Sequence, residues 1–292
     1  MDKVEQAVKR LQAAAEMSEQ VYGQPLIVTD SGGKDSSVCK RLAEIARIDY
    51  EILHSHTTAD APETFFFLQS EFRRLENMGV KCTREMPVYK GKRTSMWDLI
   101  RQNMFPPTRW SRYCCKVLKE RGGQKRFIVT GVRWSESKKR KSRGVYESLS
   151  KNKNSRVILN NDNDDKRRLF ENCALKAKRV CNPIIDWTDD DVWSFIQEEH
   201  IPVNPLYSEG STRVGCVGCP LAGREKRKNE FMRWPKYKNC YMIAFEKMLE
   251  ERNKHGKETT WKTAQDVFDW WMEEKRELPG QIKLTDATEE VE

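Results

Sequence analysis

The segment from Ser31 to Ser36, SGGKDS, has the residue types that point most directly to chemistry. Two adjacent glycines let the backbone turn tightly and present several N–H groups to one cluster of phosphates. Serine hydroxyls and the Lys34 ammonium add further donors for an anion. A bare Gly-Gly pair would more often be an ordinary turn, so this interpretation depends on the whole segment. The segment is not a Walker loop, because Val28 occupies the position of that loop's first glycine.

We therefore predict a phosphate-binding loop with Lys34 and Asp35 as candidate catalytic residues. The predicted nucleotide-binding residues of the loop are Ser31, Gly32, Gly33, Lys34, Asp35 and Ser36.

Four of the nine cysteines are grouped, as Cys114-Cys115 and as the pair Cys216 and Cys219. Soft thiolates suit iron–sulfur clusters or zinc. A Cys-x-x-Cys pair alone is a weak signal, and the residues by themselves leave a cluster, zinc and four free thiols open. An odd number of cysteines without an export signal makes a disulfide framework unexpected. The other five stand apart and are more typical of packed thiols: Cys39, Cys82, Cys173, Cys181 and Cys240.

Alternating strands and helices must position these residues. Apolar runs predict strands at 25–30, 50–54, 80–86 and 126–130, and helical spacing predicts helices at 2–20, 36–47 and 62–78. This order predicts an α/β fold with a doubly wound, mainly parallel, Rossmann-like sheet. Ligands of such sheets bind at the carboxyl ends of the strands, where the loops at Ser31 and Gly131 emerge.

The rest of the chain divides by composition. We predict a nucleotide-binding domain over 1–223 that contains a long basic and polar loop at about 138–166. Thr188 and the acidic residues after it predict the start of another helix. A helical extension is predicted over 224–284, followed by a disordered acidic tail over 285–292.

The formal net charge is +9, and the segment 109–143 holds thirteen Lys or Arg residues against two Glu. Such a block suggests a polyanionic partner, either a phosphorylated nucleotide or nucleic acid, although a solvated basic surface is an equal expectation. The N-terminal residues have no apolar signal core, and no run approaches the ~18 apolar residues of a membrane span. We expect a cytoplasmic protein with no membrane partner. The oligomeric state is left open.

In its context of strand, loop and helix, the Ser31 segment resembles the loop of ATP pyrophosphatases, which split ATP between its α- and β-phosphates. Further segments resemble one branch of that superfamily, the phosphoadenosine phosphosulfate (PAPS) reductase family. They are Thr58 to Thr64 (TADAPET), Thr130 to Ser137 (TGVRWSES), and the downstream segments from Asn182 to Tyr207. The resemblance runs in order from about Leu26 to Leu221.

The resemblance implies an adenine nucleotide, either ATP or PAPS or adenylyl sulfate. It implies that Asp60 orients the ribose or a hydrated Mg²⁺ ion. It also implies that basic side chains neutralise the nucleotide's phosphate or sulfate groups. The further nucleotide-binding residues implied are Gly131, Arg133, Arg140 and Arg143. We assign no role to His54 and His56, which end the second strand.

The cysteine quartet of Cys114, Cys115, Cys216 and Cys219 resembles the pattern that holds a [4Fe–4S] cluster in the adenylyl-sulfate reductase branch. The resemblance favours iron over zinc. Arg112, Lys116 and Arg213 are predicted to offset the negative charge of such a cluster.

Reductases of this family also use a cysteine in a C-terminal Glu-Cys-Gly-Leu-His-type segment, which this sequence lacks; Cys240 has neither the glycine nor the histidine beside it. The first hypothesis is therefore ATP-dependent, adenylating sulfur transfer to a nucleic-acid or nucleotide acceptor, with a sulfur donor protein as a partner. The alternatives are a sulfonucleotide reductase with a different nucleophile and a non-catalytic nucleotide-binding subunit.

Overall fold

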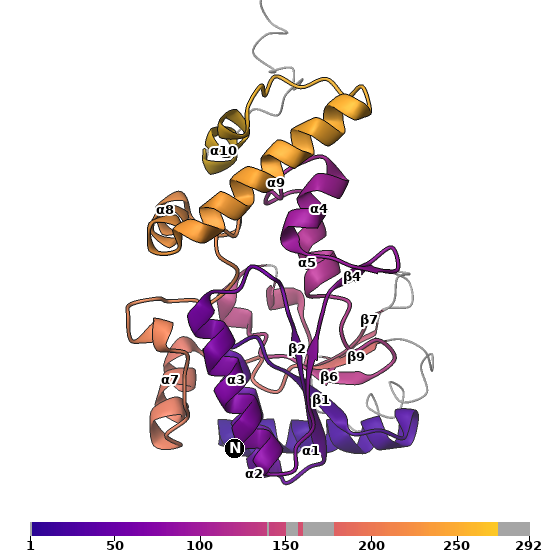
Figure 1. Cartoon of the computed structure of the whole chain (residues 1–292). Helices are drawn as coiled ribbons and strands as arrows, with labels where there is room; N and C mark the ends of the chain where they lie inside the picture. The colour runs from indigo at the N-terminus through magenta and orange to yellow at the C-terminus, as the bar shows by residue number, and fades with distance from the viewer. Residues whose placement is uncertain (1, 139, 150–156, 160–177, 274–292) are drawn as a thin grey trace, which may run out of the picture. The chain divides into compact units, whose positions relative to one another are not determined.

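The computed structural model describes residues 2–138, 140–149, 157–159 and 178–273 (Figure 1). The chain forms two compact units, which we call the sheet unit and the helical unit. The sheet unit comprises Met1–His56, Asp60–Met86 and Lys119–Gly215, and the helical unit comprises Thr57–Ala59, Pro87–Leu118 and Cys216–Glu292. This differs from the predicted division at residue 223, because segments early in the chain belong with the C-terminal helices.

A seven-stranded sheet in the order β3-β2-β1-β6-β9-β7-β8 forms the centre of the sheet unit. Its strands are β1 (Leu26–Thr29), β2 (Tyr50–Ser55), β3 (Cys82–Glu85), β6 (Phe127–Val129), β7 (Tyr146–Leu149), β8 (Val157–Leu159) and β9 (Lys178–Cys181). In this order, the first five strands (β3, β2, β1, β6 and β9) pair in parallel with their neighbours. The strand β7 is antiparallel to both β9 and β8. The predicted α/β class with a mainly parallel sheet is confirmed.

Among its described residues, this unit contains the helices α1 (Lys3–Tyr22), α2 (Lys34–Ala46), α3 (Pro62–Asn77) and α7 (Asp189–Glu198). Each contributes apolar side chains to one continuous core with the sheet, for example Leu11, Leu42, Phe72 and Phe195. Along β1, Leu26 and Val28 enter this core. Ile27 between them joins Leu53, Ile128 and Val180 in a small cluster on the opposite face, as the alternation of a strand requires.

The helical unit contains α4 (Met96–Asn103), α5 (Tyr113–Leu118), α8 (Arg224–Arg233), α9 (Pro235–Lys254), α10 (Ala264–Met272) and the hairpin of β4 (Val88–Tyr89) and β5 (Lys92–Arg93). Aromatic rings build its core. Trp271 is fully buried, with the ring centroid of Tyr241 4.6 Å away, and its indole N–H donates to the Pro107 carbonyl at 2.6 Å.

The structure confirms the predicted helices and strands of the first 130 residues and the helix that Thr188 caps. The prediction of a loop over 138–166 is wrong in the described part of that range. A 3₁₀ turn, η2 (Arg140–Ser142), is followed by β7, and β8 pairs with β7. The tail predicted at 285–292 lies outside the described residues.

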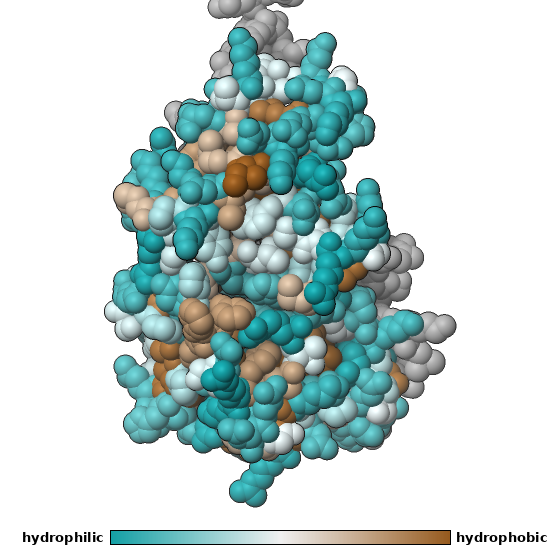
Figure 2. Space-filling view, in the orientation of Figure 1, coloured by the Kyte–Doolittle hydropathy of each residue, from teal (hydrophilic) through white to brown (hydrophobic). Residues whose placement is uncertain are grey.

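The face seen in Figure 2 is mostly hydrophilic, with apolar side chains gathered in several separate groups. Among the described helices, none combines the length and apolarity needed to cross a membrane.

Candidate functional site

The Ser31 segment connects the carboxyl end of β1 to the first turn of α2. Gly33 is the N-cap of α2 and supplies no side-chain cap. The first amides of a helix carry partial positive charge and bind anions when no side chain caps them. The loop and α2 together form an anion-binding geometry at the edge of the sheet where ligands of parallel sheets bind.

Asp30, the residue directly before the loop, holds the loop in place through its carboxylate. Its carboxylate is 2% exposed and accepts hydrogen bonds from the Gly32 N–H at 2.8 Å and from the Ser36 hydroxyl at 3.0 Å. The Lys40 ammonium lies 2.6 Å away and also contacts Glu71 at 3.2 Å. Burial acts to raise the pKa of Asp30, but the Lys40 charge and these hydrogen bonds outweigh it and lower the pKa. The loop is thus held by a charged pair inside the protein, and the Ser36 hydroxyl takes part in that support.

Residues far along the chain hold the loop from the other side. The Tyr207 hydroxyl accepts the Lys34 backbone N–H at 3.0 Å. The Asn204 amide donates to the Gly32 carbonyl at 3.3 Å and to the Thr64 hydroxyl at 3.0 Å. Gly32 has a φ of +72°, and a Cβ there would lie 2.8 Å from a Thr64 methyl group. Gly32, the first glycine of the loop, therefore has no room for a Cβ unless Thr64 moves.

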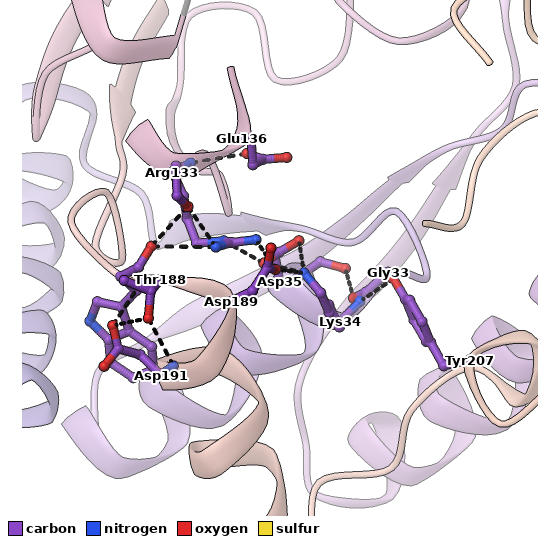
Figure 3. Close-up of polar contacts among 12 residues, drawn as sticks. Gly33, Lys34, Asp35, Arg133, Glu136, Thr188, Asp189, Asp191 and Tyr207 are labelled. Atoms are coloured by element: carbon purple, nitrogen blue, oxygen red, sulfur yellow. Dashed lines mark hydrogen bonds and ion pairs between the residues drawn. The ribbon is translucent and has the colours of Figure 1, made fainter. Parts of the chain in front are cut away.

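Figure 3 shows a charged network beside the loop. The Arg133 side chain, 1% exposed, donates to Asp35 and to Asp189, each at 2.8 Å. The Lys34 ammonium lies 2.9 Å from Asp189 and 3.3 Å from Asp35. The Lys34 hydrogen bond, the largest cause, and the Arg133 contact outweigh desolvation and lower the pKa of Asp189. Arg133 thus contacts the two carboxylates that lie beside Lys34, and its contact with a nucleotide stays a prediction.

Arg140 belongs to a second group of positive charges. Burial, followed by the charges of Arg213, Arg143 and Arg133, lowers the pKa of Arg140 to about 10. Arg140 pairs with Glu136, and Arg143 pairs with Glu147 at 2.5 Å. An anion placed among the neighbouring guanidinium groups of Arg140, Arg143 and Arg213 would be stabilised by their charges.

Gly131, at the end of β6, is a close-packing position. A Cβ on it would lie 2.8 Å from the Cβ of Asp35 and 2.9 Å from its backbone carbon.

Asp60 lies with His54 and His56, 3.6 Å from the His56 ring nitrogen Nδ1. Desolvation lowers the pKa of His56.

The cysteine quartet lies within the helical unit. Cys114 and Cys115 are on α5, and Cys216 and Cys219 are in a turn closed by a 3.2 Å hydrogen bond between their backbones. A hydrogen bond from Cys115, burial, and the charges of Cys115, Cys216 and Cys219 raise the pKa of Cys114. The two sequence pairs therefore lie near one another, and none of the four cysteines forms a disulfide.

The sequence does not predict that Asp189, Asn204 and Tyr207 contact the loop. It indicates Asp189 only as part of an acidic first turn of a helix, and Asn204 and Tyr207 only as part of a segment that resembles the family. Not all basic side chains of the segment 109–143 are available to a polyanionic partner, because Arg126 pairs with Glu51 at 3.2 Å and Arg133 is buried.

Comparison with known proteins adds the family. Residues 25–222 match the phosphoadenosine phosphosulfate reductase domain. An uncharacterized protein of Methanocaldococcus jannaschii is 29% identical over 232 residues, 77% of this chain and 47% of that protein. An adenosine 5'-phosphosulfate reductase of Staphylococcus haemolyticus is 23% identical over 239 residues, 79% of this chain and 85% of that protein.

A crystal structure of PAPS reductase from Candida auris, in a phosphate complex, is 16% identical with a TM-score of 0.44, covering 73% of this chain and 95% of that one. The chain spans about half the length of two archaeal relatives that it matches, 47% of one and 42% of the other. Because the domain match covers well over half of the sequence, the chain belongs to the phosphoadenosine phosphosulfate reductase domain family.

Proposed function

We propose that this protein binds an adenine nucleotide in the Ser31 to Ser36 loop and uses ATP to adenylate an acceptor, to which sulfur is then transferred. The observation that carries the proposal is the loop itself, which joins a parallel strand to a helix whose N-cap residue, Gly33, makes no side-chain capping hydrogen bond. Helix N-termini of this kind bind phosphate groups.

The proposed chemistry assigns distinct roles to the charged residues. An acceptor oxygen attacks the α-phosphorus of ATP, the bond to the β-phosphate breaks, and pyrophosphate leaves. The α2 amides and the Lys34 ammonium stabilise the charge that develops on pyrophosphate, together with Mg²⁺ bound to the phosphates. Asp35 and Asp189 position Lys34, and Arg133 positions both carboxylates. A sulfur nucleophile then displaces AMP from the acceptor.

The cysteine quartet supports a metal centre for the sulfur step. Four converging thiols, two of them buried, are a donor set for soft metals. The resemblance to the adenylyl-sulfate reductase branch favours a [4Fe–4S] cluster over zinc, and a cluster held there would supply a site for sulfur or electrons.

A sulfonucleotide reductase is the second candidate, favoured by relatives that carry that name. Its reaction needs a thiolate nucleophile beside the nucleotide. The described thiols of the sheet unit do not suit this role. Burial raises the pKa of Cys39 well above its ordinary value and that of Cys82 to about 11, and Cys181 is fully buried. Protonated, inaccessible thiols are poor nucleophiles.

Exposed groups of the helical unit support a nucleic-acid acceptor. Trp110 is 89% exposed, and Arg109 and Arg112 flank it in the sequence just before α5. Exposed aromatic rings flanked by arginine are typical of surfaces on which bases stack.

The third candidate is a nucleotide-binding subunit without turnover, which differs from the adenylating enzyme in releasing no pyrophosphate.

Calorimetric titration of anaerobically purified protein with ATP–Mg²⁺, PAPS and adenylyl sulfate tests the proposal. We expect preference for ATP, and at least tenfold weaker binding in Lys34→Ala, about 1.4 kcal/mol or more. Lys81→Ala, which removes an exposed lysine of the same unit, should bind as the wild type does. Preference for a sulfonucleotide would overturn adenylation in favour of reduction.

A further inference from the structure

A compact group of two histidines and one carboxylate remains outside the proposed chemistry. His54 is the next-to-last residue of β2, His56 directly follows the strand, and Asp60 precedes α3; all three belong to the sheet unit. The side chains are 4%, 20% and 10% exposed, respectively. In the described part of the chain, this is the one set of three metal-ligating side chains whose ligand atoms all lie within 4.8 Å of one another.

The distances within the group fit an ion better than they fit direct hydrogen bonds. Asp60 Oδ2 lies 3.9 Å from His54 Nε2 and 3.6 Å from His56 Nδ1. Both distances exceed those of a hydrogen bond. A zinc ion bonded at 2.0–2.2 Å places its ligand atoms about 3.4 Å apart. Closing the group around an ion therefore requires shifts of about half an ångström or less for these two pairs.

The His54 ring is already oriented as a ligand. Its Nδ1 lies 2.8 Å from the Asp30 carbonyl oxygen, which can only accept, so Nδ1 carries the proton. In the neutral ring, Nε2 then has a lone pair available to a metal, and Nε2 lies 3.9 Å from Asp60 Oδ2. Metal-binding histidines are commonly fixed in this way, by a backbone carbonyl on the other ring nitrogen. The His56 ring packs edge-on against Phe65, with ring centroids 6.4 Å apart.

We propose that His54, His56 and Asp60 form a binding site for a divalent transition metal, with zinc as the best match. Two imidazole nitrogens and one carboxylate oxygen suit zinc and its neighbours, whereas Mg²⁺ prefers oxygen ligands alone. Three protein ligands leave a coordination position for water or a substrate oxygen. The site ties the end of β2 to the start of α3. It does not depend on the identity of the nucleotide.

Zinc calorimetry tests this site, provided that the cysteine quartet does not compete for the metal. We would use the full chain carrying Cys216→Ser and Cys219→Ser, without nucleotide. The expected result is one zinc ion per chain, with at least tenfold weaker binding after His56→Ala or Asp60→Asn. Asp60→Asn keeps the size of the side chain, and its circular dichroism spectrum checks the fold. His255→Ala, an exposed histidine of the helical unit, is the matched control and should change nothing.

A second measurement keeps the native cysteines. Co²⁺ bound by nitrogen and oxygen gives weak ligand-field bands, whereas thiolate ligation adds intense sulfur-to-metal charge transfer. We expect the ligand-field bands that lack charge transfer to disappear in Asp60→Asn and persist in His255→Ala. Zinc affinity that is unchanged in both His56→Ala and Asp60→Asn would overturn the proposed metal site. Absence of zinc binding from the protein that carries Cys216→Ser and Cys219→Ser would overturn it as well. Neither result would bear on the proposal that the protein binds a nucleotide.

Discussion

Arg133 is almost completely buried, yet it serves carboxylates that reach solvent. Its guanidinium contacts Asp35 and Asp189, whose side chains are 23% and 66% exposed. Removing one member of a buried ion pair costs about 3–5 kcal/mol, and the partial exposure of the partners places Arg133→Ala at the lower end of that range, about 3 kcal/mol. Urea denaturation measures the loss.

Arg41 provides the matched control. It also contacts two carboxylates, Glu44 and Glu199, each at 2.9 Å, but its side chain is 38% exposed. Exposed pairs contribute about 1 kcal/mol or less, so Arg41→Ala should be nearly neutral. Equal losses in the two variants would contradict the importance assigned to the Arg133 network.

The Lys40 and Asp30 pair predicts a particular pH dependence. The pKa of Asp30 is lowered in the folded protein, so its contribution to stability is complete above the unfolded value of about 3.9 and is lost as the pH falls through the folded value. In Lys40→Met, burial dominates and raises this pKa, so the sign reverses. The destabilisation caused by Lys40→Met should therefore grow as the pH rises from about 3 to about 7, reaching about 3–5 kcal/mol.

Denaturation curves at several pH values in this range measure the difference between variant and wild type. Lys81→Met removes an exposed lysine that contacts Glu51 and should cost about 1 kcal/mol or less at every pH. A penalty for Lys40→Met that does not change with pH would mean that Asp30 is not held by Lys40.

For single residues, the sequence predicts the loop itself but not the distant residues that contact it. Ser31 to Ser36 are contiguous and carry recognisable chemistry, whereas the joint role of the four cysteines stays a prediction. Asp189, Asn204 and Tyr207 lie more than 150 residues away in the chain from the loop atoms that they contact. Only the fold reveals such contacts, because an acidic helix turn or a Pro-Leu-Tyr segment has an ordinary structural explanation by itself.

Among the elements, the junction of β6 with α2 is the most tightly packed part of the loop site. A Cβ on Gly131 would lie within 3.0 Å of three Asp35 atoms, two of them backbone. Backbone cannot move aside as a flexible side chain can, so Gly131→Ala should displace the first turn of α2. We expect a cost of about 1–3 kcal/mol and a loss of ATP affinity of at least tenfold.

Calorimetry and thermal denaturation of Gly131→Ala measure both effects. Gly215→Ala is the control, since a Cβ there meets no atom within 4 Å. Normal ATP affinity in Gly131→Ala would show that the β6 junction does not shape the loop.

Elements with strong local signals were predictable, and those defined by tertiary packing were not. β1, β2 and β6 are apolar runs, and β1 and β6 lead into glycine-containing loops. β7 (YESL) and β9 (KRVC) mix charged and apolar residues. They become strands because they pair with each other, and because β9 also pairs with β6 and β7 with β8. α4 is eight residues long and packs against α9, some 140 residues later, which no local pattern announces.

Over the whole molecule, each proposed site lies within a single unit. The loop with Lys34 belongs to the sheet unit, and the cysteine quartet belongs to the helical unit. The chain passes between the units several times, so neither unit can be isolated by one cut, and the full chain must be tested. Because the ligands of the two sites are separate, binding at each should survive loss of the other.

We therefore expect Lys34→Ala to keep its iron and brown colour after anaerobic purification, while losing ATP affinity. Cys219→Ser should lose the iron and keep ATP affinity within about twofold, a change of about 0.4 kcal/mol. Sulfur transfer, which needs both adenylation and a sulfur-carrying centre, should be lost in both variants, whereas pyrophosphate release should be lost only in Lys34→Ala. Iron analysis, calorimetry and pyrophosphate assays on the same preparations separate these outcomes. Iron-free wild-type protein would remove the cluster, and pyrophosphate release that fails in Cys219→Ser would mean that adenylation itself depends on the helical unit.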